Sequence, residues 1–315
     1  MSVSKTTKMA RVLGQVLSEA ELNALGKAAG HSKRLRVVTP FRLVATLLVA
    51  LGQGTSESIA DLRREFNFQT STTTAYKAFY NRLARPAFPK FMRLVAMSLM
   101  TRLAVRMLAP KPDGPLARFE DIVIQDGSSF ALKAVLCGAF PGRFKTIEPA
   151  AVEIHATFSG FHDEVIDAHV APDTVAERYY LPKAAELRNK LILADRGYPS
   201  RAYFRAIDEA DGSFVMRLSR SYKPWVLAVH DGKNMQALPE PIRLAEFLSQ
   251  NPNIPLDLDI EMGTGKKTYA CRLVVRLGKG KHRTRLCTNL LRDAFDAELV
   301  SRLYRFRWQV ELLFK

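Results

Sequence analysis

Two aspartates directly follow short apolar runs that predict β-strands. Asp126 comes after the run 121–125, and Asp195 comes after the run 191–194. Sheet proteins place their chemistry at the carboxyl ends of strands, because a rigid strand aims a short side chain accurately. For either aspartate alone the alternative is an ordinary turn, and Asp126-Gly127 is a common turn pair. The pair of strand ends therefore predicts either a site built on carboxylates or two unrelated turns.

A third carboxylate, Glu311, lies near the end of the chain. Tyr304 and Arg307 precede it at helical spacing, which places all three residues on one face of a helix. A surface ion pair between Arg307 and Glu311 is one interpretation. The other follows from the neighbours of Glu311, which make this helix apolar almost all round and predict that it is buried. A buried glutamate needs a partner or a metal ion.

The spacing around Glu311 resembles a known signature. Tyr304, Arg307 and Glu311 match the signature of DDE transposases of bacterial insertion sequences, in the insertion-sequence-four group. In that signature two residues separate Tyr from Arg, three separate Arg from Glu, and six separate Glu from a final Lys. That Lys would fall at position 318, whereas the sequence stops at Lys315, so we expect a chain that is truncated or comes from a decayed element.

The resemblance extends to the two aspartates and covers about residues 40–315. Two further motifs of the group are matched by Asp126-Gly127-Ser128-Ser129 and by Asp195-Arg196-Gly197-Tyr198. The 116 residues from Asp195 to Glu311 leave room for the β-rich insertion that this group places there.

The resemblance implies an activity and a set of ligands. Asp126, Asp195 and Glu311 would hold two Mg²⁺ ions, with Mn²⁺ as a substitute, and these would activate water and neutralise phosphate charge. The expected reaction is cleavage at insertion-sequence ends followed by strand transfer, which is cut-and-paste transposition. Tyr304, Arg307 and Arg196 would contact DNA. Expected partners are double-stranded DNA, as terminal inverted repeats and as target, and a second copy of the chain in a DNA-bound homodimer.

The net charge independently indicates a polyanionic partner. The formal charge is +16, and residues 1–118 carry +13 of it. Nucleic acid is a commoner partner of such a charge than a membrane surface. Short helices predicted over 55–64 and 75–83 could form a helix-turn-helix. Its candidate DNA-binding cations are Arg63, Arg64, Lys77 and Arg82.

The sequence contains neither a membrane-spanning run nor a secretion signal, and its three cysteines are widely spaced. We therefore expect a bacterial cytoplasmic protein that associates with the nucleoid when bound to DNA.

The predicted fold is α/β. A ribonuclease-H-like mixed sheet with helices is interrupted by a β-rich insertion and preceded by an all-helical DNA-binding domain. Four regions are predicted: a helical DNA-binding region at 1–109, the first part of the catalytic domain at 116–212, the β-rich insertion at 213–290, and the last helix of the catalytic domain at 291–315. Further helices are predicted at 19–29, 39–50, 91–109 and 174–190, the last capped by Asp173, and strands are predicted at 151–159, 165–170, 213–218, 225–229, 268–277 and 284–288.

Two other functions fit the same features. One is a non-catalytic DNA-binding regulator or inhibitor derived from a truncated transposase, and the other is a metal-dependent nuclease with the same core. His155, His162 and His169 recur every seven residues, but this spacing on strands predicts different faces, which disfavours a shared metal. Trp225 could stack on a DNA base, although an ordinary core or surface aromatic is the simpler interpretation.

Overall fold

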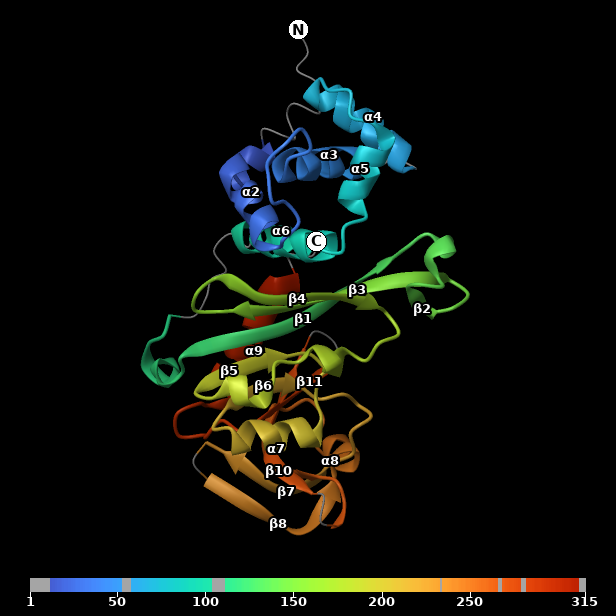
Figure 1. Cartoon of the computed structure of the whole chain (residues 1–315). Helices are drawn as coiled ribbons and strands as arrows, with labels where there is room; N and C mark the ends of the chain where they lie inside the picture. The colour runs from blue at the N-terminus through green and yellow to red at the C-terminus, as the bar shows by residue number, and fades with distance from the viewer. Residues whose placement is uncertain are drawn as a thin grey trace. The chain divides into compact units, whose positions relative to one another are not determined.

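The chain folds into two compact units, Met1–Val105 and Arg106–Lys315. The structure is a computed structural model that describes residues 12–52, 58–103, 111–232, 234–265, 268–278 and 282–311. Each unit is treated by itself below (Figure 1).

The first unit is helical in its described residues. Ser18 and Ser58 begin α2 and α4 with capping boxes, in which the serine hydroxyl accepts from a backbone N–H three residues on. The aromatic rings of Phe66 and Phe79 pack together inside this unit. Its helices include α2 (Glu19–Ala28), α3 (Pro40–Gly52), α4 (Ile59–Thr70), α5 (Tyr76–Leu83) and α6 (Phe88–Leu103).

The structure confirms the helices predicted at 19–29, 39–50 and 75–83, whereas the one predicted at 55–64 begins at Ile59 and extends to Thr70. Residues 55–57 of that helix, and 104–109 of the one predicted at 91–109, lie outside the described residues. Among the described helices, none is both long enough and apolar enough to cross a bilayer.

The second unit is built on one mixed sheet, which has 11 strands within the described residues. Its first half runs in the order β4-β3-β1-β5-β6, with β3 antiparallel to β1 and with β5 and β6 parallel to it. This order and these directions are those of a ribonuclease-H-like sheet, so the predicted fold class is confirmed. The strands of this half and its edge are β1 (Asp121–Ala131), β2 (Pro141–Phe144), β3 (Glu148–Ser159), β4 (Glu164–Pro172), β5 (Lys190–Ala194) and β6 (Ser213–Arg217).

The strands after β6 continue the same sheet. β11 pairs with β6, and the order then runs β11-β10-β9-β7-β8 with antiparallel neighbours throughout. The sequence predicted three of these five strands, β7, β10 and β11, but missed β8 and β9, although β9 alternates buried and half-buried residues along its length. These strands are β7 (Trp225–Asp231), β8 (Asn234–Arg243), β9 (Leu256–Met262), β10 (Tyr269–Leu277) and β11 (Arg283–Thr288).

The helix predicted over 174–190 is wrong. This stretch contains only two short 3-10 turns, η3 (Glu177–Tyr180) and η4 (Ala184–Leu187). Pro182 lies between them, and proline disfavours helical geometry at the residue before it. Asp173, predicted as a helix cap, instead accepts a hydrogen bond from the backbone N–H of Arg143 at 3.2 Å.

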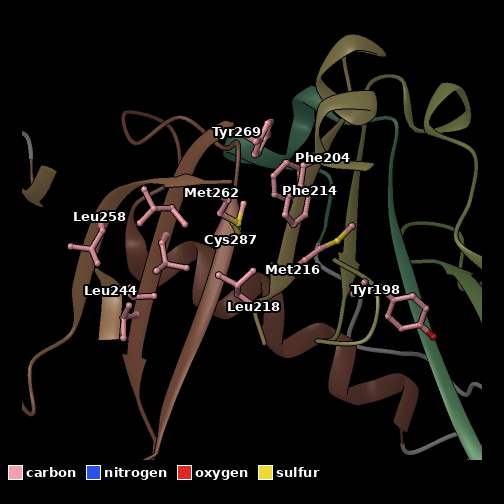
Figure 2. Packing of buried hydrophobic residues seen from close by; sticks show 14 of the residues in the cluster. Tyr198, Phe204, Phe214, Met216, Leu218, Leu244, Leu258, Met262, Tyr269 and Cys287 are labelled. Carbon is pink, nitrogen blue, oxygen red and sulfur yellow. The ribbon is translucent and has the colours of Figure 1, made fainter. Parts of the chain in front are cut away.

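Helices cover the sheet on both faces. The missed helix α7 (Arg201–Glu209) and α8 (Leu244–Gln250) bury Phe204, Ile207 and Phe247 in a large apolar cluster, part of which is drawn in Figure 2. Val123 of β1 belongs to that cluster. Helix α9 (Ala297–Glu311) contacts β1, β5, β6, β10 and β11.

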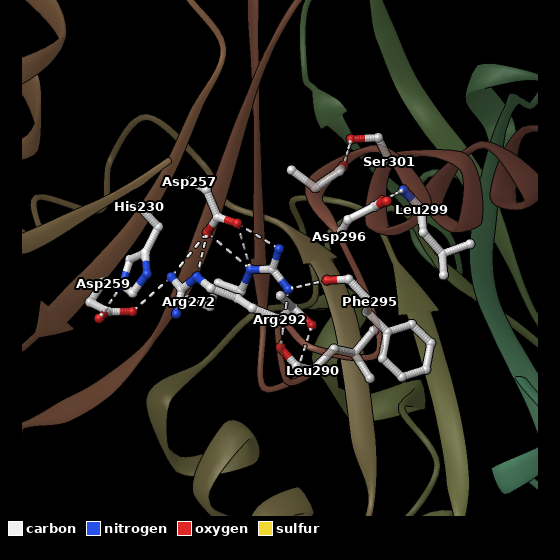
Figure 3. A network of polar contacts seen from close by, with 12 residues as sticks. His230, Asp257, Asp259, Arg272, Leu290, Arg292, Phe295, Asp296, Leu299 and Ser301 are labelled. Carbon is white, nitrogen blue, oxygen red and sulfur yellow. Dashed lines mark hydrogen bonds and ion pairs between the residues drawn. The ribbon is translucent and has the colours of Figure 1, made fainter. Parts of the chain in front are cut away.

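A buried arginine connects the sheet to the segment that leads into α9. Arg272 on β10 donates to both carboxylate oxygens of Asp257 and to the carbonyls of Leu290 and Phe295, at 3.3 and 2.6 Å (Figure 3). Asp296 then accepts from a backbone N–H in the first turn of α9. The start of α9 is therefore held by side chains of the sheet and by its own cap.

Candidate active site

The two predicted aspartates are neighbours at the point where the pairing of β1 with β5 ends. The parallel pairing of β1 and β5 ends at Gln125 and Ala194. Asp126 and Asp195 are the next residues along these neighbouring backbones, which run about 4.8 Å apart in a sheet. Parallel pairing thus brings the first and second predicted carboxylates to the same level.

The turn interpretation of Asp126-Gly127 is wrong, because β1 continues through both residues to Ala131. Gly127 has a packing role instead. A Cβ placed on it would lie 2.9 Å from Glu153 Oε1 and 3.1 Å from His155 Nδ1. Glycine lets the polar side chains of β3 approach the backbone directly beside Asp126.

Asp126 is paired with an arginine from α9. Arg307 Nη1 donates to Asp126 Oδ2 at 2.7 Å, and the two side chains are only 2% and 7% exposed. Charge-assisted bonds of this kind are strong when they are shielded from water. The other oxygen, Oδ1, accepts from the backbone N–H of Gly127 at 3.0 Å.

Asp195 is contacted by the same helix one turn earlier. The Tyr304 hydroxyl donates to Asp195 Oδ1 at 2.9 Å, and Arg217 Nη1 lies 3.5 Å from that oxygen. Burial, together with the negative charge of Asp195, raises the pKa of Tyr304, so its hydroxyl stays a proton donor. Asp195 is the more exposed aspartate, with a quarter of its side chain accessible.

Helix α9 has one buried face, so the prediction that it is buried almost all round is wrong. Leu303, Tyr304, Arg307 and Val310 are buried, whereas Trp308 is 57% exposed. The third predicted carboxylate, Glu311, follows Arg307 by four positions, about one helical turn. Its side chain and residues 312–315 lie outside what the structure describes.

Asp126 and Asp195 suit a divalent cation. They supply oxygen donors, which Mg²⁺ prefers, and Mg²⁺ needs few protein ligands because it retains water. The guanidinium of Arg307 beside Asp126 shows that this position accommodates positive charge. Within the described part of the chain, three or more His, Cys, Asp or Glu side chains do not come together as a metal site. A third protein ligand would therefore have to come from a side chain such as that of Glu311.

The face of β1 and β3 that points away from the side chain of Asp126 carries buried polar residues, among them Glu153 and His155. The sequence did not predict this polar layer. Glu153 is buried, and its Oε2 lies 3.6 Å from the half-exposed Arg143. Burial and the charge of Glu177 raise the pKa of Glu153 to about 7, with smaller contributions from Asp173 and Asp126. Alternation along strand 151–159 was the available signal, because it puts Glu153 on a buried face.

Gly197 follows Asp195 closely and also has a packing role. A Cβ on Gly197 would collide with the Glu177 carboxylate, and burial raises the pKa of Glu177. Tyr198 is almost fully buried, and its hydroxyl lies 3.5 Å from His155 Nδ1. The motif after Asp195 is therefore packed against the polar layer.

The prediction that the three histidines lie on different faces is wrong for His155 and His169. His155 and His169 are cross-strand partners on β3 and β4, and both rings contact Tyr180. They share a face because they lie on two paired strands and not on one. Burial lowers the pKa of His155 to about 4, so the ring is neutral at pH 7. The ring of Trp225 is covered by the guanidinium of Arg243, whose Cζ lies 3.7 Å from the ring centroid.

The predicted DNA-binding cations differ in exposure. Lys77 and Arg196 are exposed. Arg64 is also exposed and forms an ion pair with Asp61 on its own helix. Arg63 and Arg82 are half-buried, and burial and the neighbouring Arg85 lower the pKa of Arg82.

Phe79 is buried, whereas Tyr76 and Tyr80 stack on each other at the surface, 6.1 Å apart.

Comparison with known proteins identifies the second unit. The family model described as Transposase DDE domain matches residues 136–315, which is more than half of the chain and includes Asp195 and Glu311 but not Asp126. One similar solved structure is the cryo-EM structure of a piggyBac transposase synaptic complex with hairpin DNA, at 10% identity and a TM-score of 0.39. That match covers 98% of this chain and 66% of the other. No match was found among curated proteins. By its match over residues 136–315, the chain belongs to the transposase DDE domain family.

Proposed function

We propose that this transposase-family chain cuts DNA at the ends of an insertion sequence and joins the freed ends to target DNA. The observation that supports this most directly is the pair Asp126 and Asp195 at one level of β1 and β5, both contacted by α9. Residues that match the family's motifs thus meet in one place.

In this proposal Asp126, Asp195 and Glu311 hold two divalent cations, Mg²⁺ or Mn²⁺. When bound, such ions supply an activated water and neutralise the charge of the attacked phosphate. Tyr304 and Arg307 orient the two aspartates from α9, and their donors can also bind a DNA phosphate. Arg217 and the exposed Arg196 add positive charge beside Asp195.

The helical first unit would bind the double-stranded DNA. Its exposed cations, including Arg64 and Lys77, suit phosphate contacts. In this proposal 1–109 is the DNA-binding region, with α4 and α5 as its helix-turn-helix. The predicted insertion 213–290 separates the catalytic parts 116–212 and 291–315, except that its first strand, β6, pairs with β5 and belongs to the catalytic sheet. A homodimer would assemble on terminal inverted repeats and target DNA, in the bacterial cytoplasm at the nucleoid.

Cleavage of DNA carrying the element's ends separates this function from its two rivals. With Mg²⁺ or Mn²⁺ we expect cleavage at the ends by the wild-type chain, and a loss of at least about a thousandfold in Asp195→Asn. Asp211→Asn is a matched control, because Asp211 is exposed and its positive φ suits asparagine.

The other outcomes favour the rivals. DNA binding without cleavage by the wild-type chain would favour a regulator or inhibitor, and cleavage without preference for the ends would favour a nuclease. Equal cleavage by wild type and Asp195→Asn would refute the site.

A further inference from the structure

Helix α9 places a positive group on the very carboxylate that the proposed function assigns to a divalent cation. Arg307 Nη1 is 2.7 Å from Asp126 Oδ2, and both side chains are nearly inaccessible to water. Asp126 Oδ1 accepts from the backbone of Gly127. Each oxygen of Asp126 therefore already has a hydrogen-bond donor in the protein without metal.

The two aspartates are held unequally. Asp126 is bound by a permanent cation in a dry environment, whereas Asp195 receives a neutral hydroxyl from Tyr304 and has Arg217 at 3.5 Å. Like charges repel strongly where water is excluded. A divalent cation that binds Oδ2 of Asp126 must therefore displace the guanidinium of Arg307, whereas Asp195 presents a smaller barrier.

We propose that Arg307 is a positioning residue that keeps Asp126 in place without metal and is displaced when the divalent cation binds. This inference rests on the proposed function, because it takes Asp126 to be a metal ligand. The cost of moving Arg307 weakens metal binding in the absence of DNA. The displaced guanidinium, still on α9, then becomes available to a phosphate beside the aspartates.

A Mn²⁺ titration without DNA tests this competition. Free Mn²⁺ is followed by electron paramagnetic resonance at pH 8, with the full chain as wild type and as Arg307→Gln. Glutamine is neutral, so we expect it to bind Mn²⁺ at least about fivefold more tightly than wild type, within the range of typical coupling between sites. Arg305→Gln is the matched control, because Arg305 lies on the same helix but is exposed and paired with Glu298; it should bind Mn²⁺ as wild type does.

A second variant keeps the test decisive if the glutamine variant fails to fold. Arg307→Lys retains the charge but lacks the guanidinium fork, so its Mn²⁺ affinity should lie between those of wild type and Arg307→Gln, and above that of wild type. An affinity equal to or below that of wild type in the folded variants would overturn the inference.

Asp126→Asn distinguishes failure of this inference from failure of the proposed function. If Asp126→Asn weakens Mn²⁺ binding and neither Arg307 variant strengthens it, the metal site stands and only the competition is wrong. If Asp126→Asn binds Mn²⁺ as wild type does, Asp126 is not a ligand, and both the site and the inference fail.

Discussion

Basic side chains are held differently in the two units. In Met1–Val105, Lys77 is exposed and Arg64 forms an exposed ion pair with Asp61. In Arg106–Lys315, Arg272 and Arg307 are buried and donate to aspartates at 2.6–2.7 Å. The first unit carries most of the net charge, whereas the second uses arginines to organise acidic groups.

This difference shows why residue type alone does not define a role. The sequence predicted a phosphate contact for Arg64 by its charge and position, and the family resemblance implied one for Arg307. Burial separates them, since a buried cation must be compensated inside the protein, whereas an exposed one can exchange water for a phosphate. The following changes test this distinction.

The largest stability effect is expected at Arg272. Arg272→Met leaves Asp257 with Arg292 alone and leaves the carbonyls of Leu290 and Phe295 without this donor. Breaking a buried ion pair from one side costs about 3 kcal/mol or more of unfolding free energy. Urea unfolding followed by tryptophan fluorescence measures it, and both tryptophans, Trp225 and Trp308, belong to the second unit.

Arg276→Met is the matched control for that change. Arg276 lies on the same strand, and both it and its partner Glu298 are partly exposed. An exposed pair contributes about 0–1 kcal/mol. Equal losses in the two variants would show that burial does not distinguish these arginines.

A buried carboxylate that lacks a close, buried arginine should lose stability as pH rises. Glu153 has the half-exposed Arg143 at 3.6 Å and the neutral ring of His155 at 3.7 Å, and its pKa is raised to about 7 in the folded chain. Its contribution to stability is therefore present below pH 4.5 and is lost as pH rises through about 7. Relative to wild type, Glu153→Gln should gain up to about 3 kcal/mol between pH 5 and pH 8.

Urea unfolding of wild type and variant at the two pH values measures this gain. His155 acts in the opposite direction, because its lowered pKa removes stability as pH falls from 6.5 to about 4, so the gain of the variant is read as a difference from wild type at each pH. Glu148→Gln, at an exposed position of the same strand, should show no such gain. A constant difference between Glu153→Gln and wild type would contradict the buried, protonated state.

The smallest effects are expected in the first unit. Arg64→Ala or Lys77→Ala should each weaken DNA binding and reduce the salt-dependence slope by about 0.9 for each phosphate that is no longer neutralised. Arg63→Ala should change the slope less, because Arg63 is half-buried. Binding isotherms across a salt series measure this, and a slope unchanged in all three variants would place the DNA surface elsewhere.

Local pattern was sufficient for much of the second unit. The apolar runs before Asp126 and Asp195 are the strands β1 and β5, and the last helix is α9. The local pattern gave a wrong prediction where one residue opposed the tendency of the rest of its stretch. Pro182 divided the predicted helix at 174–190, and Gly127 proved to be a point of close packing inside β1 and not a turn.

The sequence by itself determined which elements carry the chemistry, because apolar period and helical spacing are local properties. It therefore located Asp195 after a strand and Tyr304, Arg307 and Glu311 on one helix. Only the tertiary structure decided what these side chains contact. Tyr304 meets Asp195 across 109 residues, and Arg307 meets Asp126 across 181. Such pairings depend on strand order, on the face of the sheet that α9 covers and on the exclusion of water. A local sequence pattern determines none of these.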